Sequence, residues 1–286
     1  MNYFDINDIA AKPVDRLSTT FDELDWAIGR FKDVGADGNS TPGWGLPKGM
    51  ISLWGGENGI GKTRLIVEIV KRMDMAGHSS LVFQGEVSPE QFKGEKMHNY
   101  VPKSNIWVSS ETAVDEQMRI IKELKPSLVV TDSVQQIEEY NGGRGAKDIV
   151  RKVRTALSYG GHLIFISQLT VGKTPRGGTA LPHEVDIVCT LERWDPVAPP
   201  IFVMTVGKNR FGTTGRQVLF AHKEDGVECQ SQMRLADTYW ALSHGTRVRS
   251  MIGWRLVEEP TPAKRDGILM GCIKGIFGRR SNTAIT

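Results

Sequence analysis

The sequence has little cysteine, no long apolar run and no basic leader, and each shortage argues against a class of protein. Its 286 residues contain three cysteines, and no two of them form a C-x-x-C pair. This odd, scattered set argues against a secreted disulfide framework and a cysteine-held zinc site. No apolar stretch approaches membrane-spanning length, and the first residues, Met1 to Asp8, lack a signal-peptide pattern. We therefore expect a cytoplasmic protein without a membrane span.

The sequence also lacks a strong excess of either charge. Lys and Arg number 36 and Asp and Glu 33, which gives a formal net charge of +3. An excess this small permits contact with a polyanion but does not demand nucleic acid. There is no internal repeat and no low-complexity tract. The length suits one main domain with additions.

What the sequence does contain is an alternation of short apolar runs and amphipathic helical patterns. It begins with a strand pattern at 50–54 and a helical pattern from Lys62 to about Met75. Further apolar runs lie at 81–84, 105–108, 127–130 and 162–166. Runs that are apolar on both faces predict an α/β fold with a mainly parallel central sheet flanked by helices. Three later runs, at 185–191, 201–206 and 217–220, leave little room for helices, so we expect antiparallel hairpins that extend one edge of the sheet.

Before this alternation the sequence predicts a short helix and then a loop. Apolar residues at helical spacing begin at Phe21, and Thr19 or Thr20 is the expected N-cap. From Phe31 to Pro47 the composition turns to Gly, Asp, Asn, Ser and Pro, which is typical of a surface loop.

A phosphate-binding loop follows the first strand and opens the first long helix. Its residues are Gly56, Glu57, Asn58, Gly59, Ile60, Gly61, Lys62 and Thr63, which match G-x-x-x-x-G-K-[ST]. Glycines let the backbone curl so that N–H groups face phosphates, and the helix N-terminus adds partial positive charge. We expect Lys62 to reach the β- and γ-phosphates and the Thr63 hydroxyl to ligate Mg²⁺. The motif therefore predicts an ATPase with ATP and Mg²⁺ as cofactors.

Two carboxylates and an amide complete the predicted catalytic set. Asp132 ends the run at 127–131 and is expected on the Mg²⁺ side, although an Asp there is more often a turn or a cap. Glu86 follows a strand that we expect beside the phosphate-loop strand, where it can act as the general base. Glu90 lies at a helix start and is expected to serve the cap instead. Gln168 ends the run at 162–166 and either senses the γ-phosphate or satisfies local backbone groups.

Several strings together resemble the RadA/Sms branch of the RecA superfamily, which is related to DnaB-type hexameric helicases. They are Arg16-Leu17-Ser18-Thr19-Thr20 with Glu23-Leu24-Asp25, Gly85-Glu86, Asp132-Ser133-Val134-Gln135 and Lys208-Asn209-Arg210-Phe211-Gly212. The resemblance covers about residues 16–228. It implies a RecA-like ATPase core at 16–228, an N-terminal arm or linker at 1–15 and a C-terminal extension at 229–286.

The resemblance also implies an assembly. Related proteins form a ring, a hexamer above all, or a filament, with ATP at each subunit boundary. Lys208 and Arg210 would then reach a neighbour's γ-phosphate, whereas the residues alone favour a solvated basic hairpin. The sequence lacks the family's four-cysteine zinc module and has no room for its Lon-like domain. We therefore expect a short form of the kind that phages carry, acting in a bacterial or phage-infected cell.

Two Gly-rich basic loops are the predicted contacts with single-stranded or branched DNA. They lie at 141–147 and 170–178 and supply the cations Arg144, Lys147, Lys173 and Arg176. The helix after the first loop adds further basic residues. Neither loop contains an aromatic residue, so we expect phosphate tracking with little sequence preference. Basic Gly-rich loops are also common as simple solvated loops.

These observations predict an ATP-dependent DNA-binding motor of recombination and repair, acting by single-strand annealing, strand exchange or branch migration. Recombination or replication proteins are possible partners. One alternative is a DnaB-type replicative helicase. Another is an ATP-state switch, such as a helicase loader or a KaiC-like regulatory oligomer. The basic apolar tail around Ile268 to Phe277 either docks on a partner or a membrane surface or, as such stripes more often do, packs against protein.

Overall fold

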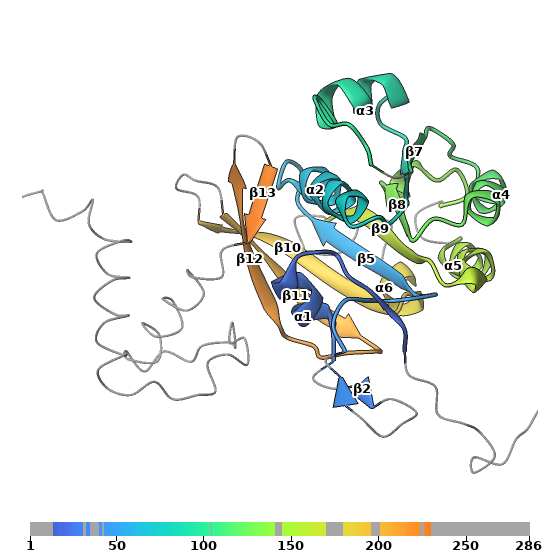
Figure 1. Cartoon of the computed structure of the whole chain (residues 1–286). Coiled ribbons are helices and arrows are strands. Elements are labelled where there is room, and N and C mark those ends of the chain that lie inside the picture. The colour runs from blue at the N-terminus through green and yellow to red at the C-terminus, as the bar shows by residue number, and fades with distance from the viewer. Residues whose placement is uncertain are drawn as a thin grey trace, which may run out of the picture.

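A nine-stranded mixed sheet forms the centre of the molecule (Figure 1). The computed structural model describes residues 14–30, 43–103, 105–140, 145–169, 180–195, 201–223 and 226–229, with two short strands, β2 at Asp33–Val34 and β3 at Ser40–Thr41. The strands of the large sheet run in the order β13-β12-β11-β10-β5-β9-β8-β6-β7. Their bounds are Ile51–Gly56 (β5), Ser80–Gln84 (β6), Ile106–Ser109 (β7), Leu128–Asp132 (β8), His162–Gln168 (β9), Ile187–Asp195 (β10), Ile201–Asn209 (β11), Gln217–Lys223 (β12) and Gly226–Cys229 (β13).

Helices cover both faces of the parallel part of this sheet. Their bounds are Asp22–Ile28 (α1), Lys62–Met75 (α2), Pro89–Lys96 (α3), Val114–Leu124 (α4), Ala146–Ala156 (α5) and Ala180–Glu184 (α6), with 3₁₀ turns at Val134–Gln136 (η2) and Leu157–Tyr159 (η3). Helices α1, α2 and α3 contribute to one apolar cluster, and α4, α5 and α6 to another. Leu53 belongs to the second cluster and its neighbour Trp54 to the first. Because β5, β6, β8 and β9 are buried on both sides, their apolar runs are continuous, as the sequence predicts.

The far edge of the sheet is antiparallel. Strand β10 runs parallel to β5, whereas β11, β12 and β13 each run antiparallel to the strand before them. The mainly parallel α/β fold and its antiparallel extension are thus confirmed.

One expected neighbour relation is wrong. The strand that leads to Glu86, β6, pairs with β8 and β7, and β9 and β8 lie between it and β5. The reason lies in the crossovers, which are right-handed in nearly all parallel sheets. The chain moves outward from β5 to β7 through α2 and α3, and returns inward through α4 and α5 on the other face. The returning strands β8 and β9 therefore fill the space beside β5.

The segment around α1, which precedes the phosphate loop in the sequence, also differs from expectation. The N-cap of α1 is Phe21, without a side-chain cap, and neither Thr19 nor Thr20 plays that part. Thr19 instead donates its hydroxyl and its N–H to the buried Asp25 carboxylate, at 2.6 and 2.8 Å. The prediction of a Thr cap is therefore wrong: Phe21 stands at the N-cap, and the Thr19 hydroxyl binds the Asp25 carboxylate inside the helix.

The predicted surface loop at 31–47 ends in an ordered element. Leu46–Pro47 forms β4, which pairs antiparallel with β1 at Arg16–Leu17. Leu46 is fully buried, so apolar burial orders this end of the segment. The predicted arm up to residue 13, and the predicted extension and tail beyond Cys229, lie outside the described residues. Within the described part of the chain, no helix is long and apolar enough to cross a membrane.

Candidate functional site

The phosphate loop curls between the end of β5 and the start of α2. Gly59 and Gly61 have φ angles of +72° and +98°, in the left-handed region that favours glycine. A side chain at Gly56 would approach Ile60 and Leu191 at 3.0 to 3.2 Å. The glycines of the motif are therefore needed for backbone shape and for close approach, as the sequence predicts.

Lys62 lies over this loop. Its Nζ atom donates to the carbonyl oxygens of Gly56 and Glu57, each at 2.8 Å. Burial lowers the pKa of Lys62, and the charges of Asp132, Glu86 and Glu57 act in the opposite direction. The ammonium is thus held at the mouth of the loop, where an anionic ligand would favour its charged form.

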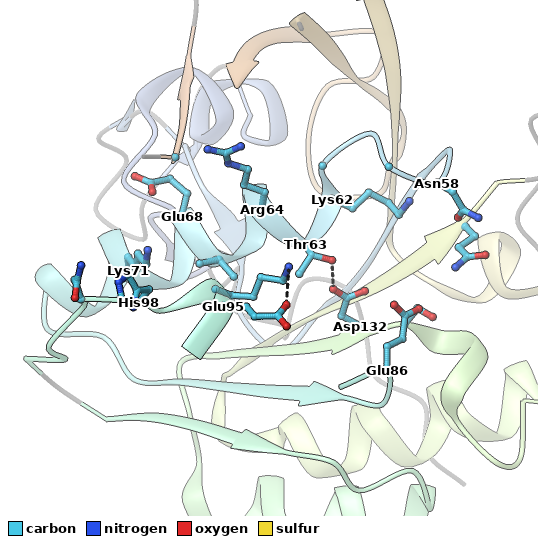
Figure 2. Close-up of a pocket in the computed structure, with 18 residues that line it drawn as sticks. Asn58, Lys62, Thr63, Arg64, Glu68, Lys71, Glu86, Glu95, His98 and Asp132 are labelled. Carbon is cyan, nitrogen blue, oxygen red and sulfur yellow. Dashed lines mark hydrogen bonds and ion pairs between the residues drawn. The ribbon is translucent and has the colours of Figure 1, made fainter. Parts of the chain in front are cut away.

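Thr63 and Asp132 face each other across the floor of the pocket. The Thr63 hydroxyl donates to Asp132 Oδ2 at 2.5 Å (Figure 2). Asp132 is 6% exposed, and burial raises its pKa while the Thr63 bond lowers it. Hydroxyl and carboxylate oxygens are the donors that Mg²⁺ prefers, in sites where phosphate and water complete the shell. No cluster of three or more acidic, His or Cys side chains exists among the described residues, so a metal here would depend on such outside oxygens.

Glu86 and Gln168 line the same pocket, Glu86 from just past the end of β6 and Gln168 from the end of β9. Gln84 pairs in register with Asp132, so Glu86 comes two residues past that point, at the same edge of the sheet. Gln168 pairs in register with Gly56 at the start of the phosphate loop. Because parallel strands end at one edge, Glu86 reaches the pocket although its strand is not next to β5. The sequence-predicted set of Lys62, Thr63, Glu86, Asp132 and Gln168 therefore meets in one cavity.

This cavity, of about 1020 Å³, continues beyond the predicted residues. Its outer part is lined by Arg64, Glu68 and Lys71 of α2 (Figure 2). The end of α3 and the residues just after it add Glu95, Lys96, His98 and Asn99. Gly226 of β13 closes another side. The motifs in the sequence do not predict this part. Its one local signal is the helical spacing of positions 64, 68 and 71 on a single face.

Lys208 and Arg210 lie at the opposite end of the sheet. Lys208 Nζ donates to the carbonyl oxygens of Pro182, His183 and Val185, at 2.8, 2.8 and 2.7 Å. Arg210 lies 3.5 Å from the Asp186 carboxylate. Ile187 pairs with Asn209 on β11 and with Ser52 at the start of β5, whereas the phosphate loop follows the end of β5. The structure therefore does not bring these two cations to the pocket of their own chain.

The structure describes one of the four predicted DNA-contacting residues. Lys147 is exposed in the first turn of α5, whereas Arg144, Lys173 and Arg176 lie outside the described residues.

The basic residues that follow on α5 are not free charges. Arg151 pairs with Asp148 at 2.5 Å, Lys152 with Asp115 at 2.6 Å and Arg154 with Asp186 at 2.8 Å. Acidic partners thus offset the charges of these three residues, and a part for this helix in DNA contact stays a prediction.

Comparison with known proteins identifies relatives. No protein-family model matches the chain. The DNA repair protein RadA of Mycolicibacterium smegmatis is 30% identical over 200 residues, which is 66% of this chain and 42% of that protein. The DNA repair protein RadA of Aquifex aeolicus is 30% identical over 223 residues, or 75% and 46%. That of Listeria monocytogenes is 28% identical over 262 residues, or 88% and 54%. The chain thus spans about half the length of these relatives.

Proposed function

The chain belongs to the RadA-like branch of the RecA superfamily, and from that premise we propose that its core binds and hydrolyses MgATP. The observation that carries this proposal is the convergence of Lys62, Thr63, Glu86, Asp132 and Gln168 on one pocket. We assign residues 16–228 to this core and 229–286 to an extension.

Each residue of the pocket has a part in the proposed reaction. The loop N–H groups hold the phosphates, and Lys62 moves from the Gly56 and Glu57 carbonyls to the β- and γ-phosphates. Thr63 and Asp132 would hold Mg²⁺, which neutralises charge on the phosphate oxygens. Glu86 orients the attacking water and accepts its proton. Gln168 contacts the γ-phosphate through its amide.

The outer part of the pocket suits the rest of the nucleotide. Its walls carry charged and polar side chains from α2 and from Glu95, Lys96, His98 and Asn99, at the side of the loop away from Glu86 (Figure 2). We assign the ribose and base to this part. The volume of about 1020 Å³ lies at the upper end of the range for small-molecule and cofactor pockets.

Lys208 and Arg210 are assigned to the nucleotide of a neighbouring subunit in a ring, such as a hexamer, or in a filament. In their own chain they lie at the other end of the sheet, so only another copy's pocket can receive them. Lys208 must leave three backbone carbonyls to do so. A cation supplied in this way stabilises charge on the transferred phosphoryl group.

We further propose that ATP turnover serves DNA recombination or repair, with single-stranded or branched DNA at the loops 141–147 and 170–178. The relatives' names support this assignment. A hydrogen bond supports coupling between DNA and nucleotide. Gln135 Nε2, on the segment that leads to the first loop, donates to Ser167 Oγ at 2.8 Å. Ser167 precedes Gln168, which leads to the second loop.

The test is ATP hydrolysis with and without single-stranded DNA. We expect DNA to stimulate turnover, and Lys62→Ala, or Lys208→Ala with Arg210→Ala, to lower it by about 100-fold or more. Arg119→Ala is the control, because Arg119 pairs with exposed carboxylates of its own helix. Mixing the two inactive proteins should restore part of the activity, since an intact pocket then meets an intact pair of cations.

Other outcomes point to other functions. Turnover that ignores DNA would favour an ATP-state switch. Processive unwinding of duplex DNA without annealing or branch migration would favour a replicative helicase of the DnaB type. A failure of mixing to restore activity would remove Lys208 and Arg210 from the neighbour's site.

A further inference from the structure

His222 of β12 lies directly behind the phosphate loop, although 162 residues separate it from Ile60. Its Nε2 atom is 3.0 Å from the carbonyl oxygen of Ile60. One ring carbon lies 2.0 Å from the place that a Cβ atom would take on Gly61. The ring also packs on Phe202, with centroids 4.9 Å apart. The imidazole is therefore fixed between the core and the loop.

The chemistry of this contact decides which ring nitrogen carries a proton. A carbonyl oxygen only accepts, so Nε2 is the donor to Ile60. The other nitrogen, Nδ1, is buried and has no hydrogen-bond partner among the described residues. Among the described residues, the hydrogen bond from Nε2 to Ile60 is thus the one hydrogen bond that the ring makes.

A hydrogen bond to the Ile60 carbonyl also sets the direction of an N–H group. In a trans peptide the C=O and the following N–H point to opposite sides. When the oxygen of Ile60 points toward β12, the N–H of Gly61 points away from β12, toward the pocket that Gly61 lines. N–H groups of this loop are the ones that hold phosphate oxygens.

The rest of the β12–β13 hairpin is seated on the same structure. Arg64, in the first turn of α2, donates to the carbonyl oxygen of Lys223. A Cβ atom on Gly226 would lie 2.9 Å from Glu68, one turn further along α2. The hairpin therefore follows α2 outward from the loop, and His222 is held in place from both sides.

We propose that His222 is a positioning residue for the β-phosphate of the nucleotide. By donating to the Ile60 carbonyl it fixes the Ile60–Gly61 peptide, so that the Gly61 N–H faces the bound phosphate. The inference rests on the nucleotide binding proposed above. The phosphate is bound in the ground state and in the transition state alike, so the loss of His222 raises Kd and KM and leaves kcat almost unchanged.

The experiment measures MgADP binding by calorimetry together with kcat and KM for ATP. His222→Phe keeps a flat ring against Phe202 and Gly61 but cannot donate, and His222→Leu is a second non-donating variant in case the first does not fold. We expect about three- to tenfold weaker MgADP binding and a matching rise in KM, the effect of one net hydrogen bond. His222→Gln should restore most of the affinity, because its amide nitrogen can take the place of Nε2.

A control variant removes a different hydrogen bond from the same strand. Gln217 Nε2 donates to Thr205 Oγ1 at 3.0 Å, away from the loop, so Gln217→Leu should bind MgADP as the unaltered protein does. Wild-type affinity in a folded non-donating variant, or weak binding that Gln does not restore, would overturn the role of His222. If the unaltered protein bound MgADP no better than Lys62→Ala, the nucleotide function itself would fail.

Discussion

Buried polar groups lie at both ends of the parallel strands, but the two ends hold them differently. At the carboxyl ends, Lys62 contacts two backbone carbonyls and Asp132 accepts from one hydroxyl, and both line an open cavity. At the amino ends, His162 and Asp186 are 0% and 1% exposed. Every side-chain nitrogen and oxygen of these two residues has a partner inside the protein.

The buried polar groups at the amino ends form hydrogen bonds and an ion pair within the protein. His162 Nδ1 donates to the Pro47 carbonyl and its Nε2 accepts from the Ser52 hydroxyl, each at 2.7 Å. The Asp186 carboxylate accepts from the Ile51 N–H at 3.0 Å and from Arg154 at 2.8 Å. Complete pairing of this kind makes burial of polar groups compatible with stability.

At the carboxyl ends, by contrast, the charged groups are partly buried without a full set of partners in the protein. Burial lowers the pKa of Lys62 and raises that of Asp132, so it acts against the charge of both groups. A phosphate beside Lys62 and a cation beside Asp132 would remove that penalty. The carboxyl end is therefore suited to binding and the amino end to stability. Substitutions of Glu86 at the carboxyl end and of the buried network at the amino end should accordingly separate activity from stability.

The largest expected effect is on catalysis at the carboxyl end. Glu86→Gln should lower kcat by roughly 100- to 10,000-fold, the usual contribution of a general base, because the amide cannot accept the proton of water. MgADP affinity and the unfolding midpoint should stay as they are, since Glu86 is exposed. Steady-state kinetics and thermal unfolding measure both. Glu90→Gln, in the first turn of α3, is the matched control and should keep full turnover.

The next effect is on stability at the amino end. Asp186→Asn should lower the free energy of unfolding by about 3 kcal/mol, because it leaves Arg154 without its buried counter-charge. Urea unfolding measures the change. Asp148→Asn breaks the exposed pair with Arg151, whose side chain is 75% exposed, and should cost less than about 0.5 kcal/mol. Equal losses in the two variants would contradict the distinction between buried and exposed pairs.

Local patterns in the sequence predict the carboxyl end well. The phosphate loop is one contiguous string, and its strand and helix flank it directly, so spacing alone identifies Lys62 and Thr63. Asp132 and Glu86 each follow an apolar strand, and parallel strands bring such residues to one edge whatever their order. The wrong neighbour assigned to β6 therefore did not affect the prediction that both carboxylates meet the loop.

The amino end could not be predicted in this way. Ser52 and His162 are 110 residues apart, and Ile51 and Asp186 are 135 apart. These partners meet only because β9 and β10 flank β5, and strand order depends on the direction of each crossover. The same holds for His222 behind the loop. A periodic pattern reports which residues are buried and leaves open which residues they touch.

The third prediction concerns pH. Burial lowers the pKa of His162 to about 4, from 6.5 without burial, so the folded state takes up its proton later than the unfolded state does as pH falls. The stabilisation from His162 is therefore present above pH 6.5 and is lost progressively down to pH 4. It should change by about 2 kcal/mol between pH 7 and pH 5.

His162→Asn isolates this contribution. The Asn amide can still donate to the Pro47 carbonyl but does not titrate in this range. The difference in unfolding free energy between the two proteins, measured in urea at several pH values, should shrink as pH falls from 7 to 5. A constant difference would mean that the pKa of His162 is the same in the folded and unfolded states.

The smallest effect compares two buried serines near the starts of β5 and β6. Ser52 and Ser80 are both 0% exposed, but only Ser52 has a hydrogen-bond partner for its hydroxyl among the described residues, namely His162. Ser52→Ala should cost about 1 kcal/mol in the free energy of unfolding, because it leaves a buried nitrogen without a donor. Ser80→Ala should be neutral or slightly stabilising, since it removes a hydroxyl that pays a burial penalty without a bond. Urea unfolding at pH 7 measures both. If the two substitutions cost the same, the pairing at the amino ends adds nothing beyond packing, and the difference between the two ends of the sheet would lie in the open cavity alone.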